Sequence, residues 1–349
     1  MIRRQLRIFI LALLCIGLGC SLAHCMSFTV QPYLQQPAGT GMSILWVTSE
    51  AARGQIQVGR KADRLGKPIP AENVQPDICR VDLSRLKPGA RYFYRVQSTT
   101  AAGETLSSDI RSFVTLNPRA KSTRAVFFND LHSNLDAFKA VAGQCGNLDY
   151  SLAFFNGDCW QDPTKRETVL KVLSGYVEGI KPSTPLLFAH GNHEWRGPLS
   201  NQMWTLFAMP NLNGQSEWGN QHWYYSFTQG PVHFTILDCG EDDHKKMDLF
   251  QPYRQQEAEW LKQEVQSPEF RKAAFRVLVQ HLPFYTRYNG VYNEEGEISA
   301  PTKELFEPIL KDAGIDLAIC AHTHRNQIFD PRDTANAGKF PYPLVIGGG

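Results

Sequence analysis

Five short apolar runs beyond residue 120 of this 349-residue chain each lead into Asp, Asn or His. The runs and the polar residues that follow them are 125–128 before Asp130 and His132, 151–155 before Asp158, 185–188 before Asn192, 277–279 before His281, and 317–319 before His322 and His324. Runs of this length are typical of buried strands. Because open α/β sheets bind ligands beyond the carboxyl ends of their strands, we expect the five polar clusters to converge on one site.

The side chains in these clusters indicate a metal centre. Asp, Asn and His supply oxygen and nitrogen donors, which suit zinc, manganese or iron better than calcium or copper(I). His322 and His324 lie two residues apart in a segment that reads as extended, so their side chains point to the same side. At a rise of about 3.3 Å per residue their α-carbons are ~6 to 7 Å apart. That spacing allows each histidine to bind a different ion, which favours a dinuclear site.

The pattern of the chain changes near residue 120, which predicts two domains. Residues 27–116 alternate short strands, such as 92–96, with turn signals and show no long helical pattern, as in an all-β sandwich. The polar, proline-containing stretch 117–123 is expected to be a linker. From 124 to 349 apolar runs alternate with amphipathic stretches such as 168–177, which is typical of an α/β domain.

Within the predicted sandwich, residues 86–92 resemble the turn and buried tyrosine that close fibronectin type III domains. In that corner the phenol, here Tyr92, is tied back to the nearby backbone. The segment is also compatible with an ordinary β-turn, so the motif favours the fibronectin-like sandwich without requiring it.

The N-terminus has the pattern of a secretory signal peptide. Three arginines precede an apolar run at 8–18, and Ser21-Leu22-Ala23 follows as a small-x-small cleavage pattern. The run is shorter than the ~20 residues needed to span a bilayer, so we expect residues 1–23 to be removed and no transmembrane span to remain. The predicted location is therefore extracytoplasmic, either periplasmic or secreted.

Cysteine and charge usage adds few constraints. Cys20 and Cys25 leave a lipid-anchored N-terminus open, although 17–20 is a poor lipoprotein cleavage box. The eight cysteines include no C-x-x-C pair, so a metal role for cysteine is not expected. With 36 basic and 34 acidic residues and no long run of like charge, the chain has no nucleic-acid footprint. The sequence indicates no oligomeric state.

Taken in order, the five clusters resemble the motifs DxH, GDxx, GNH[DE], a lone H and GHxH of the calcineurin-like metallophosphoesterases. The resemblance covers the chain from about Thr123 onward, and it implies a four-layer αββα domain. A sandwich preceding such a domain resembles the purple acid phosphatases in particular, as do residues 223–227 and 230–234. The chain ends at 343–349, where the resemblance implies further strand residues.

The resemblance also implies roles for individual residues. One metal ion would be held by Asp130, His132, Asp158 and His324, and the other by Asp158 as a bridge with Asn192, His281 and His322. The nucleophile would be a metal-bound hydroxide. His193 would stay free of metal and assist the leaving group, and Glu194 would orient His193. His190 and Arg196 flank this turn and are candidate substrate contacts, since arginine suits phosphate.

One position departs from the purple type. The tyrosine that those enzymes carry three residues after the aspartate of GD is Gln161 here, so His132 is expected to take the vacant ligand place. Divalent manganese, zinc or iron is therefore expected, iron(III) is less favoured, and no purple colour is expected.

The predicted activity is hydrolysis of a small-molecule phosphomonoester. One alternative is a phosphodiester or pyrophosphate hydrolase, because the same metals serve all three reactions. A second, from another class, is an extracytoplasmic binding or adhesion protein whose catalytic domain is vestigial. The chain contains no G-x-S-x-G elbow, which argues against a serine hydrolase.

Overall fold

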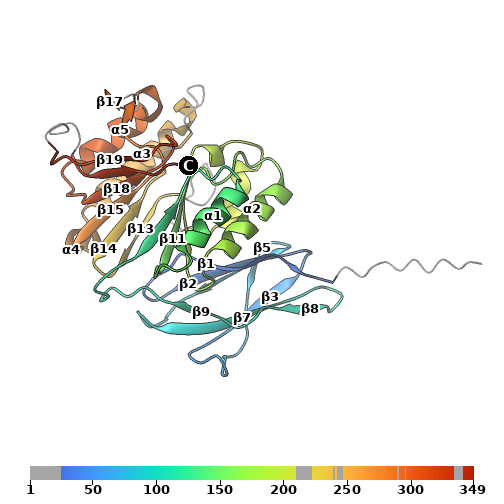
Figure 1. Ribbon diagram of the computed structural model, residues 1–349. Coiled ribbons are helices and arrows are strands. Elements are labelled where there is room, and N and C mark those ends of the chain that lie inside the picture. Colours follow the sequence, from blue (N-terminus) through green and yellow to red (C-terminus); the bar gives the residue numbers. More distant parts are fainter. Residues whose placement is uncertain are drawn as a thin grey trace, which may run out of the picture.

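The computed structural model describes residues 25–209, 222–238, 240–241, 247–288, 291–294, 296–333 and 341–349. The predicted signal peptide lies outside the described residues. Figure 1 shows the two parts of the chain, with the N-terminal strands in blue and cyan below the α/β part in green to red. Among the helices of the described ranges, none combines the length and the apolar character needed to cross a bilayer.

The N-terminal part is a sandwich of two antiparallel sheets. The first sheet has the order β1 (Phe28–Gln35), β2 (Met42–Thr48), β6 (Ile78–Leu83) and β5 (Glu72–Gln75). The second has the order β4 (Ile69–Pro70), β3 (Arg53–Gly59), β7 (Arg91–Thr99) and β8 (Thr105–Ser107), and β9 (Arg111–Val114) also pairs with β7. Alternate residues of β7 are buried, as a sheet with one solvated face requires. Between the sheets lies Trp46, whose indole nitrogen donates to Ser98 Oγ at 2.8 Å.

The expected tie of Tyr92 to the backbone is confirmed. The amide nitrogen of Lys87 donates to the phenol oxygen of Tyr92 at 2.9 Å. Gly89 between them has a φ of 63°, which a glycine adopts without steric cost. The turn therefore closes the sandwich in the way that the sequence predicts.

The second part has four layers, helices on either side of two stacked sheets. The first sheet is parallel, with the order β10 (Ala125–Phe128), β11 (Leu152–Asn156) and β12 (Leu186–Ala189). The second has the order β13 (Tyr225–Gln229), β14 (Val232–Ile236), β15 (Phe275–Val279), β18 (Leu317–Cys320), β20 (Leu344–Ile346) and β19 (Gln327–Phe329). β11 and β12 are buried on both faces, which explains their uninterrupted apolar runs.

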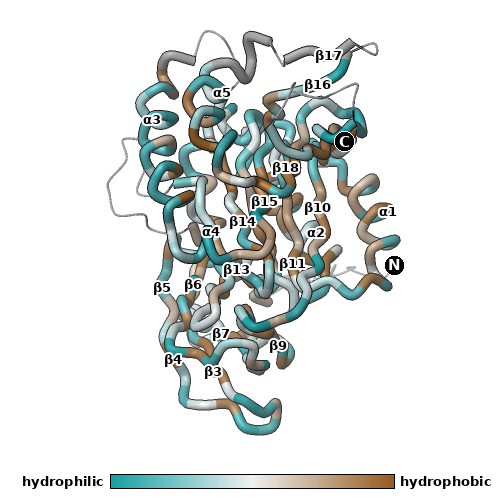
Figure 2. The backbone as a smooth tube through the Cα atoms, turned by 90° about the vertical axis from the view of Figure 1, so that its left-hand side faces the viewer, coloured by the Kyte–Doolittle hydropathy of each residue, from teal (hydrophilic) through white to brown (hydrophobic). Residues whose placement is uncertain are grey.

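Helices cover the outer faces of both sheets, as Figure 2 shows. α1 (Leu135–Cys145) and α2 (Arg166–Gly179) pack on the first sheet, where the Phe128 and Phe138 rings are 5.2 Å apart. α3 (Met247–Glu264) and α5 (Gly296–Leu310) pack on the second, and α4 (Pro268–Lys272) precedes β15. Between the sheets, the Phe154 and Phe234 rings are 5.2 Å apart. Two short 3-10 helices, η1 (His193–Trp195) and η2 (Ser200–Leu206), follow β12, and β16 (Tyr285–Tyr288) pairs with β17 (Val291–Glu294).

The two parts share a continuous apolar core. Val30 and Val47 of the sandwich belong to the same buried cluster as Phe155 of β11. The hydroxyl of Tyr33 donates to the carbonyl oxygen of Leu206 at 2.8 Å. The predicted all-β sandwich followed by a four-layer α/β domain is therefore confirmed.

The stretch expected to be a linker is held in place. The Asn117 amide nitrogen donates to Gln229 Oε1 at 2.8 Å, and the Gly230 amide nitrogen donates to the Asn117 carbonyl at 3.0 Å. Residues 117–123 are thus attached by hydrogen bonds to the turn between β13 and β14.

Candidate metal centre

Every predicted ligand lies just beyond the carboxyl end of a strand that runs parallel to its neighbours. β10 leads to Asp130 and His132, β11 to Asp158, β12 to Asn192, β15 to His281, and β18 to His322 and His324. Because the sheets are parallel here, these ends meet at one edge of the domain, which is where open α/β sheets bind their ligands.

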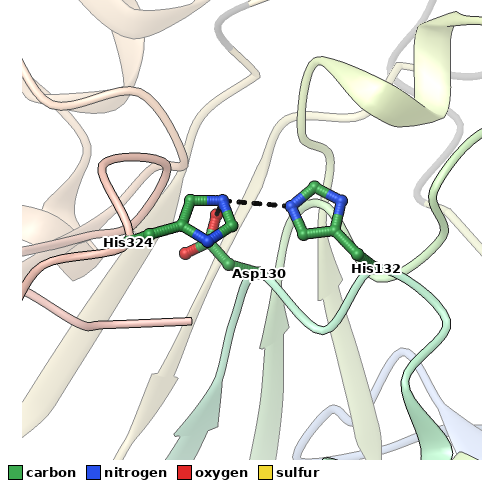
Figure 3. Close-up of side chains that lie close together, drawn as sticks. All are labelled: Asp130, His132 and His324. Carbon is green, nitrogen blue, oxygen red and sulfur yellow. Dashed lines mark hydrogen bonds and ion pairs between the residues drawn. The ribbon is translucent and has the colours of Figure 1, made fainter.

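Asp130, His132 and His324 form the first group, in which one ligand atom from each residue lies within 4.8 Å of the others. Figure 3 shows the two imidazole rings with the Asp130 carboxylate beside His324. His132 Nε2 and His324 Nε2 are 3.1 Å apart. Two ring nitrogens at that distance repel unless a proton or a cation lies between them, so the pair suits a shared cation.

A second group joins Asp158, His281 and His322. His281 Nε2 lies 3.2 Å from Asp158 Oδ2, and His322 Nδ1 lies 3.2 Å from Asn192 Oδ1. Asp158 also belongs to a third group with His132 and His193. The Asp158 carboxylate therefore links the second group to His132 of the first group, where a bridging ligand is expected.

The surroundings of His281 fit a metal ligand. Its Nδ1 lies 2.8 Å from the carbonyl oxygen of Asn156, which requires Nδ1 to carry the proton and leaves the lone pair on Nε2. Nε2 is buried, and the carboxylate of Asp158, another proposed ligand, lies 3.2 Å from it. A backbone carbonyl that fixes the tautomer in this way is the usual support of a metal-binding histidine. The donor set and this buried nitrogen, which faces a carboxylate, both fit a divalent cation.

The buried charges of the second group stabilise one another. Burial alone raises the pKa of the Asp158 carboxyl, but the adjacent His281 outweighs burial and holds that pKa well below its usual range. Burial alone lowers the pKa of His281, but Asp158 and then Asp130 raise that pKa to about 10. A metal ion must displace this proton, so protons compete with metal at this position.

The backbone of the site adopts conformations that side chains other than glycine rarely take. Among the described residues, eight non-glycine positions have positive φ, and six of them lie in the site: Asp130 at 50°, His132 at 43°, Ser133 at 64°, Asp158 at 50°, His322 at 71° and His324 at 54°. Each such residue costs roughly 1 to 3 kcal/mol. Three loops, those after β10, β11 and β18, therefore hold strained conformations that aim their ligands inward.

Two motif glycines are required by close packing. A β-carbon on Gly157 would collide with the ring of His281, and one on Gly191 would collide with the Asp158 amide nitrogen. The glycines of the GD and GN motifs thus let two ligand loops and His281 approach each other.

Glu194 was expected to orient His193, but its carboxylate binds backbone amides and not the His193 ring. The Glu194 carboxylate is fully buried and accepts hydrogen bonds from the backbone amides of Asp158 (3.0 Å), Cys159 (2.7 Å), Trp160 (3.2 Å) and Gly191 (2.9 Å). Glu194 therefore fixes the loop that carries Asp158 against the loop that carries Asn192. It positions ligands and does not orient His193.

His193 is oriented by other groups. Its Nδ1 contacts the carbonyl oxygen of Gln161 and lies 3.2 Å from Asp162 Oδ1. Its Nε2 lies 3.9 Å from Asp158 Oδ2 and 2.9 Å from Arg196 Nη1. The sequence analysis missed Asp162, although its place four residues after Asp158 on the same loop was a usable signal.

The two candidate substrate contacts have different surroundings. His190 is 1% exposed and packs between Trp195 and Trp223, with ring centroids 4.6 and 4.5 Å apart. Burial lowers the pKa of His190 to about 3. The expected substrate contact of His190 is therefore wrong, because the ring lies in the core. Arg196 is half-buried beside His193, and its Nε donates to Glu241 Oε1 at 3.0 Å.

Comparison with known proteins gives two family matches. Residues 123–326 match the calcineurin-like phosphoesterase family, and residues 29–115 match the N-terminal domain of purple acid phosphatases. Purple acid phosphatase 15 of Arabidopsis thaliana is 23% identical over 71% of this chain and 48% of its own length. Human acid phosphatase type 7 is 24% identical over 90% of this chain and 74% of its own length. The chain spans about half the length of several of these relatives.

Solved structures share the whole fold. A purple acid phosphatase from yellow lupin seeds superposes with a TM-score of 0.68 at 19% identity, covering 93% of this chain and 65% of that one. PhoD superposes with a TM-score of 0.66 at 12% identity, covering 92% of this chain and 77% of that one. At these identities the likeness concerns the fold alone.

Proposed function

Because the chain belongs to the calcineurin-like phosphoesterase family, we propose that it is a metal-dependent phosphoric ester hydrolase that acts on small-molecule phosphomonoesters. One observation carries the proposal. Seven side chains from five strand ends come together, and the carboxylate of one of them, Asp158, lies within reach of both histidine groups. The alternative of a binding protein with a vestigial catalytic domain would not require all seven donors to be present.

The proposed ligands divide into two sets that share Asp158. Asp130, His132 and His324 would hold one divalent ion, and Asn192, His281 and His322 would hold the other. When bound, two such ions lower the pKa of bound water and polarise the phosphate oxygens. Manganese, zinc or iron(II) is proposed, since nitrogen and oxygen donors predominate and Gln161 stands where the purple enzymes have tyrosine.

His193 would assist departure of the alcohol. The Gln161 carbonyl holds the Nδ1 side of His193, so Nε2 would be the ring atom that faces the leaving oxygen. Such general acid catalysis is commonly worth about 10² to 10⁴ in rate. Asp162, whose Oδ1 lies 3.2 Å from Nδ1, would help to orient the ring.

We also propose that the protein acts outside the cytoplasm, either in the periplasm or after secretion. The proposal rests on the signal-peptide pattern of residues 1–23. Mass spectrometry of the N-terminus of protein recovered from a secreting host would locate the cleavage, and an uncleaved Met1 would contradict it.

The test is hydrolysis of a paired aryl phosphomonoester and aryl phosphodiester by the mature protein loaded with manganese, zinc or iron(II). Metal content is measured by elemental analysis on the same samples. We expect two ions per chain and faster turnover of the monoester. Faster turnover of the diester would favour the alternative reaction, and failure to bind any of the three metals would overturn the enzyme proposal.

A further inference from the structure

A partly buried arginine lies beside the proposed catalytic histidine. The Arg196 side chain is 29% exposed, and its Nη1 is 2.9 Å from His193 Nε2. His193 Nε2 is in turn 3.9 Å from Asp158 Oδ2. The guanidinium is thus at most about 7 Å from the shared carboxylate, because the two distances add up to that bound. A phosphate group that bridges the ligand sets would come within reach of it.

A buried carboxylate holds the other edge of this guanidinium. Glu241 Oε1 accepts from Arg196 Nε at 3.0 Å, and the Glu241 side chain is fully buried. Nε is therefore anchored away from the site while Nη1 points to His193. A charged anchor of this kind restricts the rotamers of the long Arg196 side chain, so less conformational entropy is lost when that side chain binds a ligand.

Glu241 is itself set by a buried polar network at the end of β14. Arg254 Nη2 donates to the Glu241 carbonyl at 2.8 Å, and the Gly240 amide nitrogen donates to Asp238 Oδ1 at 2.8 Å. Tyr253 donates to Asp238 Oδ2 at 3.0 Å. Asp238, Glu241 and Arg254 are all fully buried. These hydrogen bonds fix the segment that carries Glu241, and with it the anchor of Arg196.

We propose that Arg196, positioned by Glu241, binds the substrate phosphate and selects phosphomonoesters over phosphodiesters. The inference rests on the phosphoesterase function proposed above. Arg196 acts as a specificity-determining residue that contacts substrate, and Glu241 acts as a positioning residue.

The selectivity follows from the charge and shape of the two substrates. A phosphomonoester dianion has three non-bridging oxygens, whereas a diester has two and half the charge. With two oxygens facing the ligand sets, only the monoester keeps a third that can accept from Arg196. In a diester that place is taken by an esterified oxygen with its organic group. Arginine suits this contact because its planar fork can donate two hydrogen bonds to one phosphate.

The test compares four variants with the wild-type protein: Arg196→Ala, Arg196→Lys, Glu241→Gln and Arg276→Ala. Arg276 is the matched control, since it is also partly buried, at 23%, and also faces a carboxylate, that of Asp316. Arg276 lies near the start of β15, whereas His281 follows the end of that strand. Each sample is checked for two bound metals and for its unfolding temperature before use.

We measure kcat/KM for the paired monoester and diester, and the affinity for inorganic phosphate by calorimetry. Removing a charge-assisted hydrogen bond lowers a binding constant or kcat/KM by about 10- to 100-fold. Arg196→Ala should lower kcat/KM for the monoester and the phosphate affinity by that factor while changing diester turnover much less. Arg196→Lys and Glu241→Gln should shift the monoester-to-diester ratio in the same direction by less, and Arg276→Ala should leave it unchanged.

The outcomes separate the two proposals. If wild-type protein with two metals turns over neither substrate, the proposed function fails, and phosphate affinity alone decides the role of Arg196. If turnover is normal but the ratio and the phosphate affinity match wild type in Arg196→Ala, the inference is overturned while the function stands. Should Arg196→Ala not fold, unchanged values in both Arg196→Lys and Glu241→Gln overturn the inference.

Discussion

The two proposed metal positions differ in how deeply the protein encloses them. The closed position, formed by Asp158, Asn192, His281 and His322, includes a His281 side chain that is 0% exposed. The open position, formed by Asp130, His132 and His324, includes a His324 side chain that is 51% exposed. One ion would therefore lie in the interior of the domain and the other near its surface.

Among the described residues, surrounding groups also hold the ligands of the closed position more firmly than those of the open position. His281 is fixed by the Asn156 carbonyl, and Glu194 fixes the loops that carry Asp158 and Asn192. In the open position, His132 Nδ1 is buried and has no hydrogen-bond partner among the described residues. Loss of outer support typically weakens metal affinity 10- to 100-fold. The two positions have similar donors, but they should differ in metal affinity and in the rate of metal exchange. The closed position should bind its ion more tightly.

Asp158→Ala should abolish the difference between the positions by removing the carboxylate that they share. Both metal affinities should fall, and kcat/KM should fall by about 10³-fold or more, since two-metal stabilisation of charge is worth several kcal/mol. Elemental analysis and monoester kinetics check this together. Two tightly retained metals in the variant would show that Asp158 is not the bridge.

His193→Ala should leave metal binding at both positions unchanged while lowering the rate of hydrolysis. His193 lies beside the shared carboxylate, and its proposed role concerns the leaving group, so both metals should stay bound while kcat falls about 10² to 10⁴-fold. For a substrate with a very acidic leaving group, kcat should fall less, because departure of that group needs less help from a proton donor. Equal losses for good and poor leaving groups would contradict the assigned role.

His281→Ala and His324→Ala form a matched pair that tests the comparison directly. Each should lose one metal, but only His281→Ala leaves a buried cavity and unpaired groups, so it should also lose about 2 to 4 kcal/mol of unfolding free energy. His324→Ala should unfold at nearly the wild-type denaturant concentration. Chelator dialysis of wild-type protein should release one ion well before the other, and simultaneous release would argue against two unequal positions.

The smallest expected effect is a pH dependence of folding stability that arises from Asp238, which is a ligand in neither metal position. Burial raises the pKa of Asp238 to about 6, so its contribution to stability is complete below about pH 4 and is lost as pH rises through 6. Asp238→Asn should remove about 1 to 3 kcal/mol of that dependence between pH 4 and 7. Denaturation at several pH values, in wild type and variant, measures the slope. Identical slopes would place the titration elsewhere.

Much of the site was predictable because its chemistry needs particular donors at particular strand ends. Asp130, Asp158 and His281 each follow an apolar run, and the parallel order of the strands brings them together. The four-layer arrangement itself came from the family resemblance and not from periodicity, and the order of the strands was not predicted. The domain boundaries and the ligand roles stay predictions.

The supporting residues were harder to predict because their roles depend on the folded backbone. Glu194 looks in sequence like a partner of its neighbour His193, yet its carboxylate points to four backbone amides. His190 lies just two residues before Asn192, but its ring faces the aromatic core. Glu241 follows a strand end like the ligands do, and applying the same rule to β14 would have indicated it.

The core that runs from the sandwich into the α/β domain has a consequence for how the molecule melts. Val30 and Val47 pack in one cluster with Phe155, and β11, which contains Phe155, leads directly to Asp158. Heat should therefore disrupt both domains in one cooperative transition, with equal calorimetric and van't Hoff enthalpies. A cavity cut in the sandwich at Val47 would then lower the temperature at which the distant phosphate chemistry is lost, although no atom of Val47 touches that site.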